Sequence, residues 1–214
     1  MVTLQLRQLD VPLGQRLLVR NVSWSELESI LSEMGDERAA RIAYSAEVLE
    51  IRMPLPKHER TKSILGDAIK ILLEELAIDC ECFGSTTFKR QEMNYGIEPD
   101  DCFYIQNHRL MIGKDRVDLS IDPPPDLAIE VDVTSKTQMD AYLKLGVPEL
   151  WIYGDGELKI YTWQLGEYHL STVSPTFGAL PVLSLIQDML DSSVSTGRSP
   201  ALRDFRQAVR SLTY

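Results

Sequence analysis

Hydrophobic residues recur every three or four positions in some parts of the chain, as in helices, and at every second position or in short runs in others, as in strands. Over 57–79, apolar residues recur every three or four positions on one face while charged residues cover the other, which predicts a long amphipathic helix. A shorter helix is predicted over 24–34, with Ser23 or Ser25 as its N-cap and Gly35 as its C-cap. The first part of the chain therefore contains two helices of clear pattern.

Strand spacing dominates much of the remaining chain. Two short strands around a turn near Ser45 are predicted within 41–54, and an apolar strand is predicted over 126–134. The other predicted elements are strand-like segments at 80–90, 102–107 and either 109–113 or 116–121, a turn at 94–101, a helix at 136–146, a three-stranded meander within 147–170, and helices at 183–193 and 199–214 joined by a loop at 193–199.

The order of these elements indicates an α/β or α+β fold, in which a mixed β-sheet is flanked by helices. Because the helix at 136–146 lies between two strands, it is a candidate for the crossover of a parallel strand pair. We expect an N-terminal arm over 1–22, one main domain over 23–192 and a helical extension over 193–214. A chain of 214 residues can bury enough apolar surface to fold without a disulfide or a structural metal.

The charge balance bears on the partners that the protein can have. The chain has 32 acidic and 22 basic residues, a formal net charge of −10. Proteins that coat nucleic acid draw affinity from a basic surface, so the balance argues against that class. It does not exclude an enzyme that grips a short segment of DNA through a metal ion, and local basic clusters occur at 57–62 and at Lys89–Arg90.

Cysteine usage and hydropathy bear on location. No apolar run approaches the roughly 20 residues that cross a bilayer, and the first residues lack the pattern of a secretory signal. The three cysteines, Cys80, Cys82 and Cys102, are an odd number without the spacing of a metal site, which suits free thiols in a reducing compartment. We therefore expect a cytoplasmic protein with no membrane segment.

Acidic residues interrupt the apolar strand at 126–134. Burying an unpaired carboxylate costs several kcal/mol, so Glu130 and Asp132, which share one side of this strand, need partners. Asp100 lies at the start of another strand, and carboxylates gathered on one sheet form a natural site for Mg²⁺, which prefers oxygen ligands. Such an ion polarises a phosphoryl oxygen and activates water for phosphodiester hydrolysis. The alternative is that the acids lie at a sheet edge or pair with Lys and Arg of neighbouring strands.

Three further residues are candidates for the same site. Glu50 alternates with apolar residues in a predicted strand and could point into the same pocket. His58 begins the long helix, where backbone N–H groups attract anions, so it either holds a phosphate or a water or is simply exposed. Lys136, at a strand-to-helix junction, either stabilises charge developing on phosphorus or lies in solvent. We expect exposed turn positions for Glu98 and Asp101, and a strand-end position for Asp126.

Four segments in this order resemble the Uma family of restriction-endonuclease-like proteins, within the PD-(D/E)XK nuclease superfamily. They are "GIEPDDCFYI" (96–105), "PPPDLAIEVDVTS" (123–135), "AYLKLGVPELWIY" (141–153) and "ELKIYTW" (157–163), and the upstream "YSAEVLEIRMPLPKHE" (44–59) also fits. The resemblance covers roughly 24–163. It implies a restriction-endonuclease-like core, a mixed sheet flanked by helices, that cleaves DNA with Mg²⁺ or Mn²⁺.

The resemblance also implies roles for individual residues. Asp100 matches the aspartate that follows a proline in the family motif, and Glu130 matches the acid of the (D/E)-x-K element. Both would then ligate the metal ion, with the backbone carbonyl of Val131 as a third ligand.

The chain departs from the family pattern at the lysine. Asp132 stands two residues after Glu130, where the E-x-K lysine is expected. In many members a lysine one turn before the tyrosine that matches Tyr142 replaces it, and here that position is Gln138. Lys136 or Gln138 would then lie near the attacking water, and a glutamine supplies no charge, so reduced activity is expected.

Three functions are consistent with these features. The first is a Mg²⁺-dependent DNA endonuclease of reduced activity. The second is an inactive member of the same fold that acts through protein contacts, which the acidic charge, the absent lysine and the apolar meander over 150–163 favour. The third is a metal-dependent hydrolase of a small phosphoester, which shares the site and suits an acidic protein. We also expect a homo-oligomer, namely a dimer.

Overall fold

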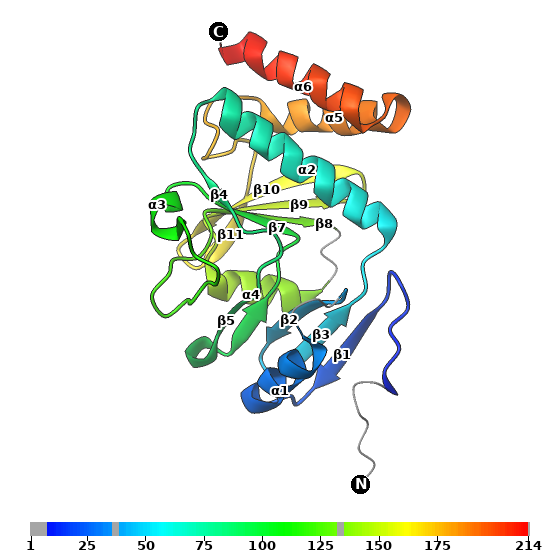
Figure 1. Ribbon diagram of the computed structural model, residues 1–214, viewed down its shortest axis with the longest axis vertical. Helices are drawn as coiled ribbons and strands as arrows, with labels where there is room; N and C mark the ends of the chain where they lie inside the picture. Colours follow the sequence, from blue (N-terminus) through cyan, green and yellow to red (C-terminus); the bar gives the residue numbers. More distant parts are fainter. Residues whose placement is uncertain (1–7, 36–38, 132–134, 214) are drawn as a thin grey trace.

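The computed structural model describes residues 8–35, 39–131 and 135–213, and its strands form two sheets (Figure 1). The first sheet is antiparallel throughout, with the strand order β1-β3-β2-β6-β5. Its strands are β1 (Arg16–Arg20), β2 (Arg41–Ser45), β3 (Val48–Arg52), β5 (Phe88–Arg90) and β6 (Tyr95–Ile97), with a short 3₁₀ turn at Gln91–Met93 between the last two.

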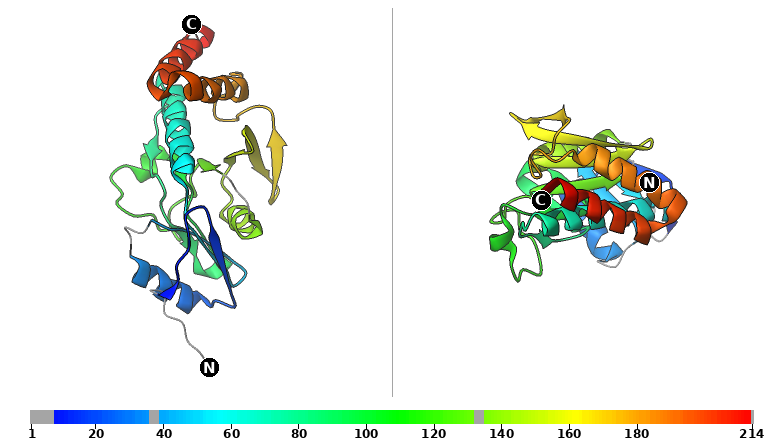
Figure 2. Two further views of the ribbon diagram at one scale, coloured as in Figure 1. Left: turned by 90° about the vertical axis from the view of Figure 1, so that its right-hand side faces the viewer. Right: turned by 90° about the horizontal axis from the view of Figure 1, so that it is seen from above.

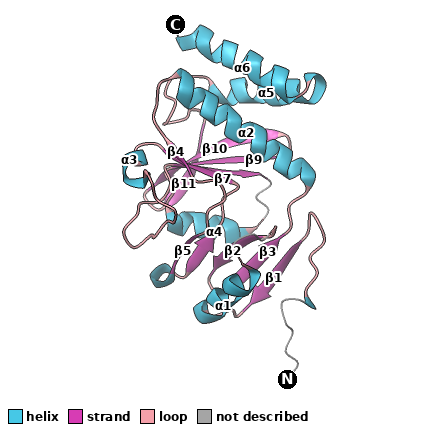
Figure 3. Cartoon of the chain, in the orientation of Figure 1, coloured by secondary structure: helices cyan, strands magenta, loops and turns pink. Residues whose placement is uncertain are grey.

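The second sheet has the order β11-β10-β9-β8-β7-β4 and is antiparallel except for the pair of β8 and β9. Its strands are β4 (Glu81–Cys82), β7 (Asp101–Tyr104), β8 (Leu127–Val131), β9 (Glu149–Gly154), β10 (Glu157–Gln164) and β11 (Glu167–Ser171). Helix α4 (Lys136–Leu145) connects β8 to the parallel β9, which confirms the predicted crossover. The mixed α/β class is confirmed, with its strands divided between two sheets (Figure 3).

The hairpin of β2 and β3 shows how local sequence sets the register of the first sheet. Ala46 and Glu47 both have positive φ, 50° and 61°, as a two-residue type I′ turn requires. This turn pairs Glu50 with Ala43. Because side chains alternate along a strand, Glu50 and Arg52 share one face of the sheet, while the intervening residues pack against α1 (Trp24–Met34) on the other.

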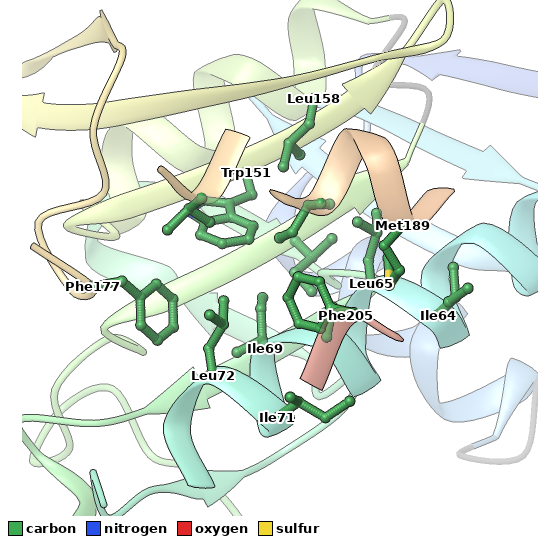
Figure 4. Close-up of a cluster of buried hydrophobic side chains, with 14 of the residues drawn as sticks. Ile64, Leu65, Ile69, Ile71, Leu72, Trp151, Leu158, Phe177, Met189 and Phe205 are labelled. Atoms are coloured by element: carbon green, nitrogen blue, oxygen red, sulfur yellow. The ribbon is translucent and has the colours of Figure 1, made fainter. Parts of the chain in front are cut away.

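Helices α1 and α2 form where the sequence predicts them. Helix α1 begins with a capping box, in which Ser23 accepts a hydrogen bond from the Glu26 N–H and Glu26 accepts one from the Ser23 N–H. Helix α2 (Pro56–Glu75) begins with a proline at its first position, where the missing N–H costs nothing. Its apolar face, including Leu65, packs on the second sheet (Figure 4).

Helix α4 lies between the two sheets (Figures 1 and 2). Its residues Ala141 and Tyr142 belong to one hydrophobic cluster with Ala43 of β2, in the first sheet, and with Ala128 of β8, in the second. This packing brings the carboxyl end of β8 close to the end of β3, since α4 begins soon after β8 and contacts both β2 and β3.

The C-terminal helices α5 (Val182–Thr196) and α6 (Arg198–Thr213) pack against α2 (Figure 2). The prediction of a loop at 193–199 is wrong, because α5 continues through Thr196 and a single residue, Gly197 with φ 88°, separates the two helices. The expected domain boundary between 192 and 193 falls inside α5. Phe205 of α6 lies in the same core as α2, so the final helix is part of the main hydrophobic cluster.

Two other element predictions are wrong. The segment at 109–113 is mostly the short helix α3 (His108–Met111), and 116–121 forms turns in which Asp118 and Asp122 accept hydrogen bonds from nearby backbone N–H groups. Such local bonds compete with strand pairing. The predicted turn at 94–101 contains β6, which is a strand because β2 and β5 pair with it.

None of the helices in the described parts of the chain combines the length and hydropathy that a membrane span needs.

Candidate functional site

Asp100 is brought to β8 by strand pairing. It immediately precedes β7, whose residue Asp101 pairs with Ile129, and its own N–H donates to the Ile129 carbonyl at 3.1 Å. The Oδ2 atom of Asp100 accepts a hydrogen bond from the Val131 N–H at 2.8 Å. The side chain is fully buried. The chain thus places this carboxylate beside the carboxyl end of β8, where Glu130 lies.

Glu130 is also fully buried, and two side chains hold its carboxylate. Tyr142 of α4 donates to Oε1 at 2.7 Å, and Arg52 of β3 donates to Oε2 at 3.3 Å. The two acids predicted from the sequence, Asp100 and Glu130, therefore lie on the same side of the sheet and share a neighbour, because Arg52 Nη2 is also 3.8 Å from Asp100 Oδ1.

Sequence reasoning gave no role in this site to Tyr142 or to Arg52. Of the two, Arg52 contacts both acids. It is the last residue of β3, and its Nη1 lies 3.5 Å from the Val131 carbonyl oxygen. A signal did exist, since Arg52 shares a strand face with the candidate Glu50. That signal could not show that this face meets β8 of the other sheet.

His58 joins the site from the first turn of α2. Its Nε2 lies 2.9 Å from the Val131 carbonyl oxygen and 3.1 Å from Asp100 Oδ2. The side chain is 6% exposed, so the reading of His58 as an exposed first-turn residue is wrong. An Nε2–H that faces both oxygens fixes the orientation of the carboxylate and of the carbonyl together.

The structure describes the side chain of Gln138 but not that of Lys136. Gln138 is 1% exposed, and with its amide oxygen turned toward Arg52 it accepts from both Nη atoms at 3.2 Å. It therefore contacts the site through Arg52. Lys136 starts α4 after the N-cap Ser135, but its side chain lies outside the described part of the structure, as does all of Asp132.

Glu50 is a third buried acid near the site. It is 1% exposed, and within the described parts of the chain neither of its carboxylate oxygens has a hydrogen-bond partner. It lies on the strand face that also presents Arg52, opposite Ala43, which packs against α4. Glu50 is thus a buried acid two positions from Arg52 on the same face of β3, and its place in the metal pocket stays a prediction.

The remaining acids have structural partners. Glu98 is buried and accepts from the Ile42 N–H at 3.0 Å, so its predicted exposure is wrong. Asp101 is the first residue of β7 and is partly buried, so its predicted exposed turn position is also wrong, and burial raises its pKa. Asp126 is buried at the start of β8, where it accepts hydrogen bonds from the N–H groups of Ile105 and Asn107. These bonds pin the loop after β7 and leave Asp126 outside the site.

The two buried acids have opposite electrostatic character. Burial raises the pKa of Asp100, but the hydrogen bond from His58 and the charge of Arg52 outweigh it, so that the pKa lies below its ordinary value. Burial, and then the charge of Asp100, raise the pKa of Glu130 to about 8 against the effects of Arg52 and Tyr142. Two adjacent carboxylates that are both buried repel each other when both are ionised. As the pH rises, Asp100 therefore loses its proton before Glu130 does.

The donor set at this point suits a hard cation. Asp100 Oδ1 is buried without a hydrogen-bond partner among the described residues, and the Glu130 carboxylate and Val131 carbonyl lie beside it. Mg²⁺ prefers such oxygen ligands and keeps waters in its other positions. Within the described ranges no three His, Cys, Asp or Glu side chains are arranged to hold a metal, so the Val131 carbonyl would have to complete the set. Arg52 contacts the same three groups, so an ion and the guanidinium would compete for them.

A comparison with protein-family models decides the family. The model of the Uma2 family, described as "Putative restriction endonuclease", matches residues 24–194. The chain belongs to the Uma2 family. The match confirms the resemblance read from the sequence and extends it through most of α5, so the fold is nuclease-like.

The chain is also similar to a solved structure, the crystal structure of a putative nuclease belonging to DUF820 from Anabaena variabilis ATCC 29413, with 18% sequence identity and a TM-score of 0.48, over 64% of this chain and 83% of that one. No curated protein matches this chain.

Proposed function

We propose that the protein is a Mg²⁺- or Mn²⁺-dependent endonuclease that hydrolyses phosphodiester bonds of DNA at Asp100 and Glu130. One observation carries the proposal: two acids 30 positions apart converge on one guanidinium, within 3.8 Å and 3.3 Å of Arg52 Nη2. Membership of the Uma2 family supports the reaction class. Asp100, Glu130 and the Val131 carbonyl would hold the metal ion, which supplies Lewis acidity and lowers the pKa of a bound water.

Two residues of this site position the acids. His58 contacts both Asp100 Oδ2 and the Val131 carbonyl through one nitrogen, which sets the distance between these two oxygens. Tyr142 holds Glu130 Oε1 and leaves Oε2 facing Arg52. Such supporting bonds keep an acid pair in one orientation before substrate arrives, and their loss weakens sites of this kind.

Arg52 takes the place of the absent lysine in this proposal. Gln138 stands where many members of the family have a lysine, and Arg52 lies against Gln138 and Glu130. A guanidinium stays charged at every working pH and presents a planar fork that suits a phosphate. Arg52 therefore brings to the acids, from a different sheet, the positive charge that stabilises the phosphate in the transition state.

A plasmid-nicking assay tests the proposed function. Wild-type protein is expected to nick supercoiled DNA with Mg²⁺ or Mn²⁺ and to lose this activity in EDTA. Glu130→Gln and Asp100→Asn should abolish nicking, while Glu157→Gln, at an exposed position of β10, should leave it unchanged. Thermal melting of each variant checks that it is folded. Equal nicking by wild type and Glu130→Gln would show that the activity belongs to a contaminant or to another site.

A second candidate function is supported by the same network. Arg52, His58 and Tyr142 give the two acids partners from the protein itself, as expected of an inactive nuclease fold that acts through protein contacts. The β10–β11 hairpin also exposes apolar side chains, including Leu165 and Leu170, that suit the interface of a homodimer. This alternative predicts a dimer by light scattering and no heat of Mg²⁺ binding by calorimetry. Tight Mg²⁺ binding that Asp100→Asn abolishes would contradict it.

A further inference from the structure

Cys80 and Cys82 form a pair of thiols outside the acid site. Their sulfur atoms lie 3.9 Å apart, because residues two positions apart in an extended chain present their side chains on the same face. All three cysteines are free thiols, of which Cys82 is exposed, Cys80 is partly buried and Cys102 is buried. We infer that Cys80 and Cys82 form a reversible disulfide when a low-molecular-weight disulfide, such as oxidised glutathione, oxidises them.

The place of the pair in the fold lets the two sulfurs approach each other. β4 is the last strand in the order of the second sheet, and Cys80 precedes it, so Cys80 can move toward Cys82 while Cys82 stays paired with Phe103. Cα atoms two positions apart in a strand are separated by roughly 6.6 Å, close to the upper limit of about 6.8 Å that a disulfide spans. A bond at this limit is strained, and strained disulfides are readily reduced again.

The surroundings of the two sulfurs set the order and the speed of the reaction. Burial raises the pKa of Cys80 and raises that of Cys82 to about 12, while the ammonium of the exposed Lys70 on α2 lowers both. A hydrogen bond from the Cys82 thiol also lowers the pKa of Cys80, so Cys80 loses its proton first. Because only thiolates attack disulfides, the reaction is slow at neutral pH, and the pair stays reduced until oxidant accumulates.

The reaction consists of two thiol–disulfide exchanges. The Cys80 thiolate attacks one sulfur of oxidised glutathione, which breaks the S–S bond of glutathione and releases one glutathione thiolate. The Cys82 thiolate then attacks the Cys80 sulfur of this mixed disulfide, which forms the protein disulfide and releases the second glutathione thiolate. The protein loses two electrons and two protons, which leave as two molecules of reduced glutathione. An excess of reduced glutathione reverses both steps.

Cys102 is an internal control for this reaction. Its side chain packs with Tyr104 in one hydrophobic cluster, whereas Cys80 packs against the cluster that contains Phe103. Because side chains alternate along β7, Cys102 lies on the opposite face of the sheet from the thiol pair. Its thiol donates to the Gly84 carbonyl at 3.3 Å, and burial raises its pKa. Cys102 should therefore remain a thiol while the pair is oxidised.

Mass spectrometry of the intact protein tests the inference. The whole chain is incubated with excess oxidised glutathione, unfolded in urea and alkylated with N-ethylmaleimide, which marks each remaining thiol. Wild type is expected to lose two hydrogen atoms, to carry no glutathione and to take up one maleimide, which peptide mapping should place at Cys102. Reduced glutathione should restore uptake at all three cysteines. Cys82→Ser should retain one glutathionyl group at Cys80, and Cys80→Ser should form no disulfide.

Three results for the wild type would overturn the inference. They are maleimide uptake at all three cysteines after oxidation, a final product that still carries glutathione, and a disulfide that includes Cys102. Loss of two hydrogen atoms by Cys80→Ser would also overturn it. Thermal melting checks that both variants are folded, and the wild-type measurement decides the outcome even if a variant is not. The result is independent of plasmid nicking, so it neither supports nor contradicts the proposed nuclease function.

Discussion

Arg52 Nη2 lies 3.3 Å from Glu130 Oε2, although the two residues are 78 positions apart and belong to different sheets. The contact places a permanent positive charge among the groups that would hold a metal ion. It has two consequences, because it stabilises the two acids without a metal and it must be disturbed when an ion binds.

Replacement of Arg52 should therefore change both stability and metal response. Arg52→Ala leaves the buried Asp100 carboxylate without its counter-ion and Glu130 without a hydrogen-bond donor, and removal of one partner from such a network costs about 3–5 kcal/mol. Mg²⁺ should raise the melting temperature of Arg52→Ala more than that of wild type, because the ion no longer competes with the guanidinium. Differential scanning fluorimetry with and without Mg²⁺ measures both effects. Arg203→Ala, at an exposed position of α6, is the control, and equal shifts in wild type and Arg52→Ala would contradict the competition.

The raised pKa of Glu130 makes stability depend on pH. In the folded protein Glu130 has a pKa of about 8 and keeps its proton up to that pH, whereas in the unfolded chain it releases the proton near its ordinary pKa of 4.5. The folded state thus binds more protons in this interval, and the free energy of unfolding should fall as pH rises through it. Glu130→Gln carries no titrating group, so its unfolding free energy should fall less. Urea unfolding in EDTA across this interval measures the difference, and identical pH profiles would show that Glu130 is not the group responsible.

Tyr142→Phe should isolate the bond that holds Glu130. The substitution keeps the ring in its buried position and removes the hydroxyl that donates to Oε1 at 2.7 Å. Loss of a buried hydrogen bond that leaves its partner unsatisfied should lower the free energy of unfolding by about 1–3 kcal/mol. Nicking activity should also fall, since Glu130 is then free to reorient. Tyr161→Phe, on β10, is the matched control, and full activity in Tyr142→Phe would remove Tyr142 from the positioning role.

Replacement of Glu50 should raise the free energy of unfolding, in contrast to the replacements of Arg52 and Tyr142. Its carboxylate is buried without a hydrogen-bond partner in the described structure, so Glu50→Gln, which keeps the shape and removes the charge, should stabilise the metal-free protein by about 1–3 kcal/mol. If Glu50 also faces the metal ion, the same variant should bind Mn²⁺ more weakly in a calorimetric titration. Reduced stability together with unchanged Mn²⁺ binding would show that Glu50 has a partner that belongs to the fold.

The C-terminal helix should prove to be part of the core. Phe205 of α6 is 3% exposed and lies in the cluster that includes α2 and β9, beyond the residues that match the family model. Phe205→Ala should cost about 3–5 kcal/mol in urea unfolding, as truncation of a buried aromatic does. The exposed neighbour Arg203→Ala should change stability little. A cost below that of an ordinary surface substitution would mean that α6 is a detachable extension.

Local patterns accounted for much of the candidate site. Asp100 and Glu130 were identifiable because a carboxylate next to or inside an apolar strand demands a partner, and strand pairing then brought the two together as expected. His58 was identifiable from its place at the start of a long helix. Its burial was not, because exposure depends on what packs over that turn. The same limit applies to Glu98. The sequence around it has the composition of a turn, but the residues just before it form the strand β6 because they pair with β2.

The sequence by itself determined the main helices, the β2–β3 hairpin, the parallel crossover and the acid pair, because periodicity, caps and turn residues act over a few positions. Only the tertiary structure decided that the strands divide into two sheets and that Arg52 meets Glu130 between them. The alternation of side chains along β3 is enough to predict which face of the strand carries Arg52. Which surface that face meets depends on how α4 packs between the sheets, and that packing is a sum of many weak contacts between residues far apart in the chain.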